Sequence, residues 1–111
     1  MASDTTVEIL DRIYRVIESR RGADPEISYV ARLLRKGRSK LAQKVGEEAV
    51  EAALAAIEPD SRHLVEESAD LIFHLLVLWA DAGVRPEDVW SELQAREGKS
   101  GIDEKKSRAK S

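Results

Sequence analysis

Apolar residues recur at helical spacing along nearly the whole chain, and glycine, proline or polar residues interrupt them at intervals. In residues 5–21 the apolar positions fall on one helical face. The same spacing predicts further helices over residues 28–36, 39–57 and 61–82, and a fifth that begins at Pro86 and stops near Gly98. No segment shows the sustained alternation of a strand. The pattern therefore predicts an all-α fold, a helical bundle of about five helices.

Residues at the segment ends predict where the helices start and stop. Ser39 and Asp60 precede the third and fourth helices, where their side chains can cap free backbone N–H groups. Gly37 and Gly83 follow the second and fourth helices, where glycine favours termination.

The size of the chain fits one domain, and its composition fits a soluble globular fold. It has 111 residues, of which 42% are hydrophobic and 35% charged. The helical pattern ends by residue 98, so we expect a domain over 1–98 and a basic, polar tail over 99–111. Residues 71–79 are apolar on nearly every side of the predicted helix. A chain of this length does not easily bury so much apolar surface by itself. We therefore expect a homodimer that completes the core.

Charge and composition exclude several other classes. The formal net charge is −3, which gives no general electrostatic case for binding nucleic acid. The absence of cysteine excludes disulfides and fits a reducing cytoplasm. The first residues lack the basic and apolar regions of a signal peptide, and the longest apolar run, 75–80, is too short to span a bilayer. We expect a cytoplasmic protein without a membrane partner.

Two acidic motifs, Glu47-Glu48-x-x-Glu51 and Glu67-x-x-Asp70, interrupt segments that are otherwise apolar. Acids three residues apart project from one helical face, so two packed helices would direct several carboxylates at one point. Such a set of oxygen ligands suits Mg²⁺ or Mn²⁺, and a metal held in this way commonly acts on phosphates.

The alternative interpretation of these acids is ion pairing or a solvated acidic face. Glu48 and Glu67 both lie on the inward, apolar stripe of their helices, where an unpaired carboxylate costs free energy. Lys44 can reach Glu47 or Glu48 at helical spacing. The other acids have no basic residue four positions further on. The pattern favours metal binding but leaves the solvated face open.

A run of basic residues directly precedes the first acidic motif: Arg35, Lys36, Arg38, Lys40 and Lys44. Basic groups beside a metal site would suit a polyphosphate substrate. The alternative is a solvated surface, and no Walker A motif is present.

The two histidines and two tryptophans have simpler interpretations. We expect His74 to be a hydrogen-bonded core residue rather than a ligand, and His63 to lie at the surface. Trp79 and Trp90 occur among aliphatic residues, which predicts core or dimer-interface positions.

Three stretches carry a resemblance to a known family: Ser28 to Gly37, Lys44 to Glu51, and Glu67 to Leu78. Together with the ending Ser100 to Arg108, they resemble the phosphoribosyl-ATP pyrophosphatases of histidine biosynthesis. That family belongs to the all-α, MazG-like nucleotide pyrophosphohydrolases. The resemblance extends from about Val7 to Arg108.

The resemblance implies hydrolysis of phosphoribosyl-ATP to phosphoribosyl-AMP and pyrophosphate, with Mg²⁺ as cofactor and Mn²⁺ as an alternative. It also implies a homodimer with a helical-bundle core. Glu48, Glu51, Glu67 and Asp70 would ligate the metal, and Glu47 would be a second-site ligand or a base for water. The basic run would contact substrate phosphates, and so would three residues of the tail: Lys105, Lys106 and Arg108.

Two other functions remain to be tested. One is a house-cleaning pyrophosphatase for non-standard nucleoside triphosphates, which would use the same metal motif. The other is a helical dimerisation module without enzymatic activity, whose acids are merely solvated.

Overall fold

The computed structural model describes residues 7–98 and residue 108, and within them it is all-α, without strands. The helices run in the order α1 (Val7–Ser19), α2 (Tyr29–Lys36), α3 (Arg38–Ala55), α4 (Arg62–Ala82) and α5 (Pro86–Arg96). The expected fold class and helix order are confirmed. The basic residues Lys105 and Lys106 lie outside the described residues.

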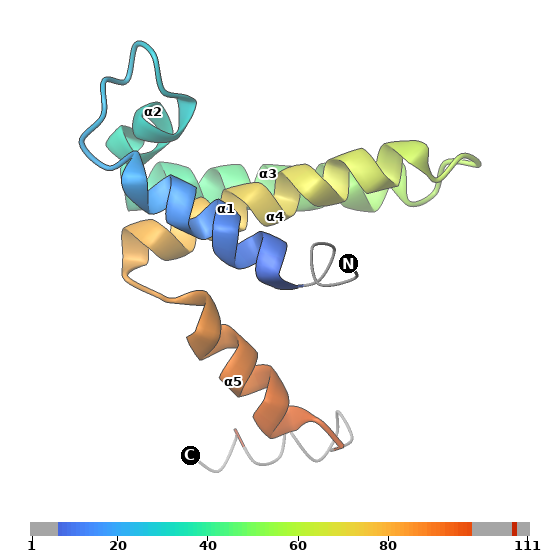
Figure 1. Cartoon of the computed structure of the whole chain (residues 1–111). Coiled ribbons are helices and arrows are strands. Elements are labelled where there is room, and N and C mark those ends of the chain that lie inside the picture. The colour runs from blue at the N-terminus through green and yellow to red at the C-terminus, as the bar shows by residue number, and fades with distance from the viewer. Residues whose placement is uncertain (1–6, 99–107, 109–111) are drawn as a thin grey trace.

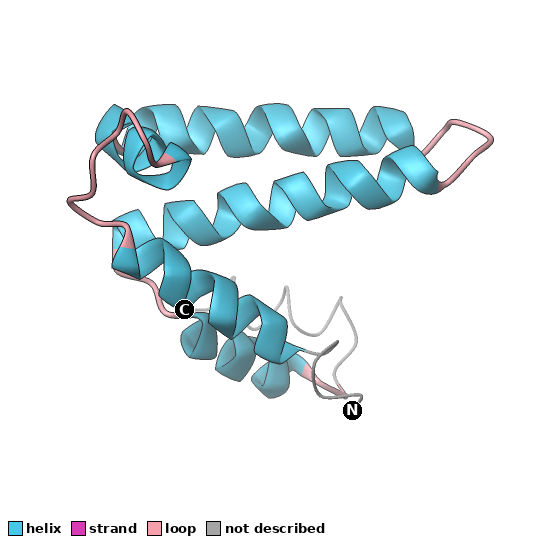
Figure 2. Ribbon diagram, turned by 45° about the horizontal axis from the view of Figure 1, so that its top comes forward, coloured by secondary structure: helices cyan, strands magenta, loops and turns pink. Residues whose placement is uncertain are grey.

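Helices α3 and α4 form an antiparallel hairpin that is the main feature of the fold (Figure 1). Helix α1 crosses α4, and α2 packs at the end of the hairpin opposite its connecting loop (Figures 1 and 2). Helix α5 packs against α1 and the end of α4 and projects away from the hairpin (Figure 1). Among residues 7–98, no other helix covers the loop end of the hairpin (Figure 1).

The core lies where α1 to α4 meet. It is formed by one buried residue each from α1, α2 and α3 and by three from α4: Ile17, Leu33, Leu41, Leu76, Val77 and Ala80. The radius of gyration is 16.2 Å, whereas a compact domain of about 100 residues has a value near 13 Å. The chain alone is thus more open than a compact domain.

Two predicted helix starts are wrong by one residue. Helix α3 begins at Arg38, so Ser39 lies inside the helix and Gly37 occupies the N-cap position. Gly37 has φ of 90° and also ends α2, so one glycine turns the chain between two helices. Helix α4 begins at Arg62 after Ser61, although the Asp60 carboxylate still accepts a hydrogen bond from the Arg62 N–H at 2.9 Å. Gly83 ends α4 with φ of 75°, as expected.

Candidate metal centre

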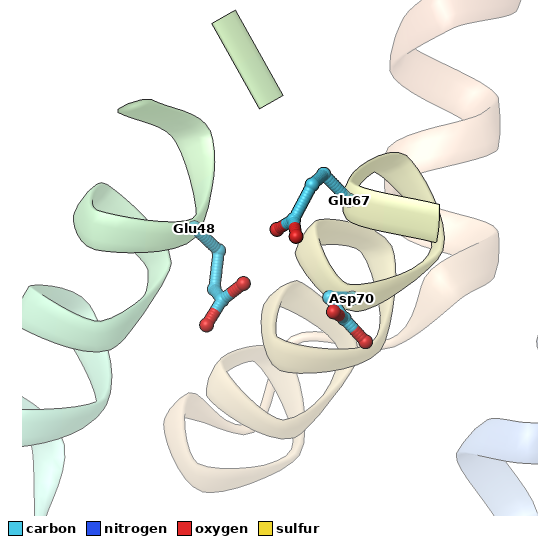
Figure 3. A group of neighbouring side chains, drawn as sticks. All are labelled: Glu48, Glu67 and Asp70. Atoms are coloured by element: carbon cyan, nitrogen blue, oxygen red, sulfur yellow. The ribbon is translucent and has the colours of Figure 1, made fainter. Parts of the chain in front are cut away.

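Three of the predicted acids converge between α3 and α4. Glu48 extends from α3 toward Glu67 and Asp70 on α4 (Figure 3). One carboxylate oxygen from each residue lies within 4.8 Å of the corresponding oxygens of the other two. Oxygen ligands at about 2.1 Å from one Mg²⁺ are separated from each other by roughly 3–4.2 Å. Small side-chain adjustments would therefore bring the three carboxylate oxygens to the separations that one Mg²⁺ requires. We call these three residues the carboxylate cluster.

The position of Glu48 follows from the helical pattern of α3. Leu41, Glu48, Ala52 and Ala55 are its buried residues, and they form the inward stripe expected from the sequence. Glu48 is only 6% exposed. A carboxylate held so deeply requires a cation or hydrogen-bond donors nearby, because its desolvation costs free energy.

Lys44 supplies one such cation. Its Nζ lies 3.4 Å from Glu48 Oε1, one helical turn earlier on α3. This ion pair raises the pKa of the Lys44 ammonium group. The predicted reach of Lys44 to the first acidic motif is therefore confirmed for Glu48.

Glu67 is paired on one oxygen only. His63, four residues earlier on α4, places Nε2 3.1 Å from Glu67 Oε1 and Nδ1 2.9 Å from Glu58 Oε2. The contact with Glu58, and to a lesser extent the one with Glu67, raises the pKa of His63. The second oxygen, Glu67 Oε2, is buried without a hydrogen-bond partner in the described residues.

The chemistry of these residues fits a divalent cation. The donors are carboxylate oxygens, which hard ions such as Mg²⁺ and Mn²⁺ prefer. A cation at this point would satisfy Glu67 Oε2 and would offset the repulsion among three acids.

The remaining two predicted acids, Glu47 and Glu51, lie outside the carboxylate cluster. Glu51 is exposed and lines a cavity of about 380 Å³ together with Glu67 and His63. Glu47 is also exposed and accepts a hydrogen bond from Gln43 Nε2 at 3.0 Å. Neither belongs to the set of three whose oxygens converge.

The basic run divides between two sides of the fold. Three lysines line a pocket of about 450 Å³ with Leu33, Leu41, Gln43 and Glu47: Lys36, Lys40 and Lys44. We call this the lysine-lined pocket. Because Lys44 also pairs with Glu48, the pocket adjoins the carboxylate cluster.

The two arginines of the run lie elsewhere. Arg38 places Nε 2.6 Å from Asp81 Oδ2 and donates a second hydrogen bond to the Asp81 carbonyl. Arg35 lines a different cavity, of about 520 Å³, which Asp81 also lines. Arg38 thus connects the start of α3 to the end of α4.

His74 is the hydrogen-bonded core residue that the sequence predicted. It is 7% exposed and contacts the Asp70 carbonyl and the Tyr29 hydroxyl. His63 lies at the surface, as expected, but its contact with Glu67 was missed. The i, i+4 spacing on one helix was the signal that could have revealed it.

Trp79 and Trp90 contact each other edge to face, with ring centroids 5.9 Å apart. They join the last turns of α4 to α5 and are both half-buried. Across the described residues, the structure contains no helix that combines the length and the apolar character required to cross a membrane.

The chain is similar to a set of named proteins over nearly its whole length. A family model described as "Phosphoribosyl-ATP pyrophosphohydrolase" matches residues 10–97. The chain is 59% identical over 110 residues to the phosphoribosyl-ATP pyrophosphatase of Paramagnetospirillum magneticum, covering 99% of each protein. It is 53% identical over 109 residues to that of Azospirillum brasilense, covering 97% of this chain and 98% of the relative. The corresponding protein of Gluconobacter oxydans is 55% identical over 102 residues, which cover 92% of this chain and 77% of the relative.

Proposed function

The chain belongs to the phosphoribosyl-ATP pyrophosphohydrolase family, and from this premise we propose that it hydrolyses phosphoribosyl-ATP to phosphoribosyl-AMP and pyrophosphate. The reaction would serve histidine biosynthesis in the cytoplasm. The observation that carries the proposal is the juxtaposition of the carboxylate cluster and the lysine-lined pocket, joined by the Lys44–Glu48 ion pair.

Glu48, Glu67 and Asp70 would hold the divalent cation, Mg²⁺ or Mn²⁺. When bound, the cation would neutralise polyphosphate charge and polarise the bond that is cleaved. Glu51 is close enough to line a cavity with Glu67, which supports a role for it at the edge of the same metal centre. Glu47 would bind a second cation or accept a proton from the attacking water.

The lysines would receive the phosphate groups. Lys36, Lys40 and Lys44 line one pocket, and the apolar residues Leu33 and Leu41 also line it. Fixed positive charges at this place would stabilise the charge that develops on the departing pyrophosphate. Arg35 and Arg38 would contribute from the neighbouring side, where Arg38 keeps donors beyond the two that Asp81 engages.

We also propose that the protein acts as a homodimer. Each helix of the hairpin carries large apolar residues that are exposed in the single chain. On α3, Val50 and Leu54 are each 59% exposed. On α4, Val65 is 57% and Ile72 is 42% exposed. A second copy that covered these residues would remove them from water.

The decisive experiment measures pyrophosphate release from phosphoribosyl-ATP, with Mg²⁺ present and after chelation by EDTA. We expect metal-dependent release of one pyrophosphate per substrate. A panel of canonical and modified nucleoside triphosphates should be poor substrates. Turnover of that panel with none of phosphoribosyl-ATP would identify a house-cleaning pyrophosphatase instead. Absence of any turnover together with absence of Mn²⁺ binding by calorimetry would favour a non-enzymatic module.

A further inference from the structure

His63 connects the loop between α3 and α4 to the carboxylate cluster. Its Nδ1 lies 2.9 Å from Oε2 of Glu58, which is in that loop, and its Nε2 lies 3.1 Å from Oε1 of Glu67, one turn further along α4. An ionised carboxylate can only accept a hydrogen bond, so each ring nitrogen makes its contact through an N–H group. Because the two nitrogens of the rigid ring point away from each other, a ring held by Glu58 presents its other N–H to Glu67 in a fixed direction.

This contact gives the two oxygens of Glu67 different surroundings. Oε1 accepts from His63, whereas Oε2 is buried and has no hydrogen-bond partner in the described residues. Glu67 extends toward Glu48 (Figure 3), and one oxygen from each of these two residues and from Asp70 lies within 4.8 Å of the others. With Oε1 engaged, Oε2 is the oxygen of Glu67 that still requires a partner, and a cation would supply it.

The contacts of His63 contribute little to stability. The side chains of His63 and Glu58 are 48% and 45% exposed, and ion pairs as exposed as these add little to the free energy of unfolding. The Glu67 side chain is only 15% exposed, so His63 restrains a largely buried carboxylate from the outside. A free glutamate side chain populates several rotamers. Fixing one of them before a ligand binds removes that ordering cost from the binding step.

There is also space into which an unrestrained Glu67 could turn. Glu58, His63 and Glu67 line the same cavity of about 380 Å³, together with Glu51 and Leu54. A Glu67 carboxylate released from His63 could therefore rotate into this cavity, away from the other two acids of the carboxylate cluster. The contact with His63 opposes that rotation.

We propose that His63 is a positioning residue for the metal centre: anchored by Glu58, it holds Oε1 of Glu67 and keeps Oε2 available to the cation. The inference rests on the proposed function, because it assigns Glu67 to the metal. Hydrogen bonds from neighbouring groups orient the side chains that bind metals, and their loss commonly lowers metal affinity about 10- to 100-fold. A ring with both N–H groups also carries a positive charge and would repel a cation. The sign of the change in metal affinity therefore separates positioning from competition.

The test uses three variants and two matched controls. His63→Ala removes both contacts, whereas His63→Gln keeps an amide N–H that can reach Glu67 at i, i+4. Glu58→Gln removes the charge that anchors the ring. The controls are Arg62→Gln and Glu66→Gln, which each remove one charge next to the contact without altering it. Arg62 and Glu66 form their own exposed pair on α4, with Nε and Oε2 3.4 Å apart.

The main measurement is Mn²⁺ affinity by calorimetry on metal-free protein, which does not depend on activity. We expect His63→Ala to weaken Mn²⁺ binding about tenfold, and His63→Gln to lie between it and the wild type. Glu58→Gln should weaken binding less. The double variant of Glu58→Gln and His63→Ala should bind like His63→Ala alone, because Glu58 acts through His63. Both controls should stay within about twofold of the wild type, since exposed charges are screened at physiological ionic strength.

Activity gives a second measurement. In His63→Ala, the Mg²⁺ concentration for half-maximal pyrophosphate release should rise about tenfold. At saturating Mg²⁺, kcat should stay near that of the wild type, because all the carboxylate ligands are retained. Circular dichroism establishes that each variant is folded.

Three results would overturn the proposal. Tighter Mn²⁺ binding by His63→Ala would show that His63 competes with the metal, and unchanged binding would show that it has no role there. A further loss in the double variant would show that Glu58 acts independently of His63. If the wild type bound Mn²⁺ but released no pyrophosphate, only the proposed function would fail, and the Mn²⁺ affinities would still decide the role of His63. A wild type that bound no Mn²⁺ would refute the metal centre and the positioning role together.

Discussion

The Nζ of Lys44 lies 3.4 Å from Oε1 of Glu48, and this one ion pair joins the lysine-lined pocket to the carboxylate cluster. Glu48 contributes a side chain that is 8% exposed, whereas that of Lys44 is 37% exposed and extends toward solvent. Lys44 therefore occupies the place of a compensating cation beside three acids. The charge balance of Glu48 in the metal-free protein depends on it.

The first prediction concerns Lys44→Gln. Loss of the ammonium leaves Glu48 buried beside two acids, so the metal-free protein should lose about 1–2 kcal/mol of stability. Breaking a fully buried ion pair would cost more, but Lys44 is partly exposed. Mn²⁺ should bind several-fold more tightly, since a competing cation is gone, while kcat/KM falls. Calorimetric titration and thermal melts with and without Mn²⁺ measure both effects. Weaker Mn²⁺ binding in this variant would contradict the assignment.

The second prediction concerns the carboxylates themselves. Glu48→Gln and Asp70→Asn should each lower turnover by at least about a hundredfold and retain the helical fold, because each removes a charged ligand. In the metal-free protein, Asp70→Asn relieves repulsion and should hold or raise the melting temperature. Glu48→Gln also relieves repulsion among the acids, but it removes the ion pair with Lys44. Because the two effects oppose each other, its melting temperature should change little. Circular dichroism and pyrophosphate release test this, and a variant that unfolds yet keeps full activity per folded molecule would make the acids structural.

The sequence predicted those parts of the fold and site that depend on helical period. The inward position of Glu48, the Lys44 contact and the hydrogen-bonded state of His74 follow from spacing along one helix. The contacts of Tyr29 with His74 and of Arg38 with Asp81 span 45 and 43 residues. No local pattern encodes them, because they depend on how α2 and α3 pack against α4.

Helix ends were predicted less well for a related reason. Ser39 has the side chain of a good N-cap, but Gly37, two residues earlier, adopts a positive φ and takes the N-cap position. The convergence of Glu48 with Glu67 and Asp70, without Glu51, depends on the relative rotation of α3 and α4. Residue spacing alone does not set that rotation.

The third prediction concerns assembly. Sedimentation should show a dimer at micromolar concentration, and a variant with Leu54→Lys and Ile72→Lys should be monomeric, because charges would replace apolar residues that the partner covers. Ile27→Lys is the control: Ile27 is 85% exposed and lies in the segment before α2. It should remain dimeric. A wild-type protein that is monomeric and fully active would rule out this assembly.

The fourth prediction concerns the basic tail, most of which lies outside the described residues. Removal of residues 99–111 should raise KM more than it lowers kcat, because a tail that contacts ground and transition states alike contributes uniform binding. The measurement belongs at low ionic strength, where charge contacts are screened least. Unchanged kinetics there would exclude Lys105, Lys106 and Arg108 from substrate binding.

The fifth prediction separates the two basic residues at the start of α3. Lys40 lines the lysine-lined pocket, so Lys40→Gln should lower kcat/KM with little change in melting temperature. Arg38 engages Asp81 through two hydrogen bonds, so Arg38→Gln should cost up to about 1 kcal/mol of stability, as expected for a partly exposed pair. The variant Asp81→Asn should lose no more stability than Arg38→Gln, because it removes the ion pair but keeps the backbone carbonyl that accepts the second hydrogen bond. If Arg38 also reaches substrate, Arg38→Gln should lower kcat/KM well beyond the effect of Asp81→Asn. If kcat/KM is equal in those two variants, Arg38 only holds α3 against α4. If Lys40→Gln leaves kcat/KM unchanged, Lys40 is not part of the phosphate site.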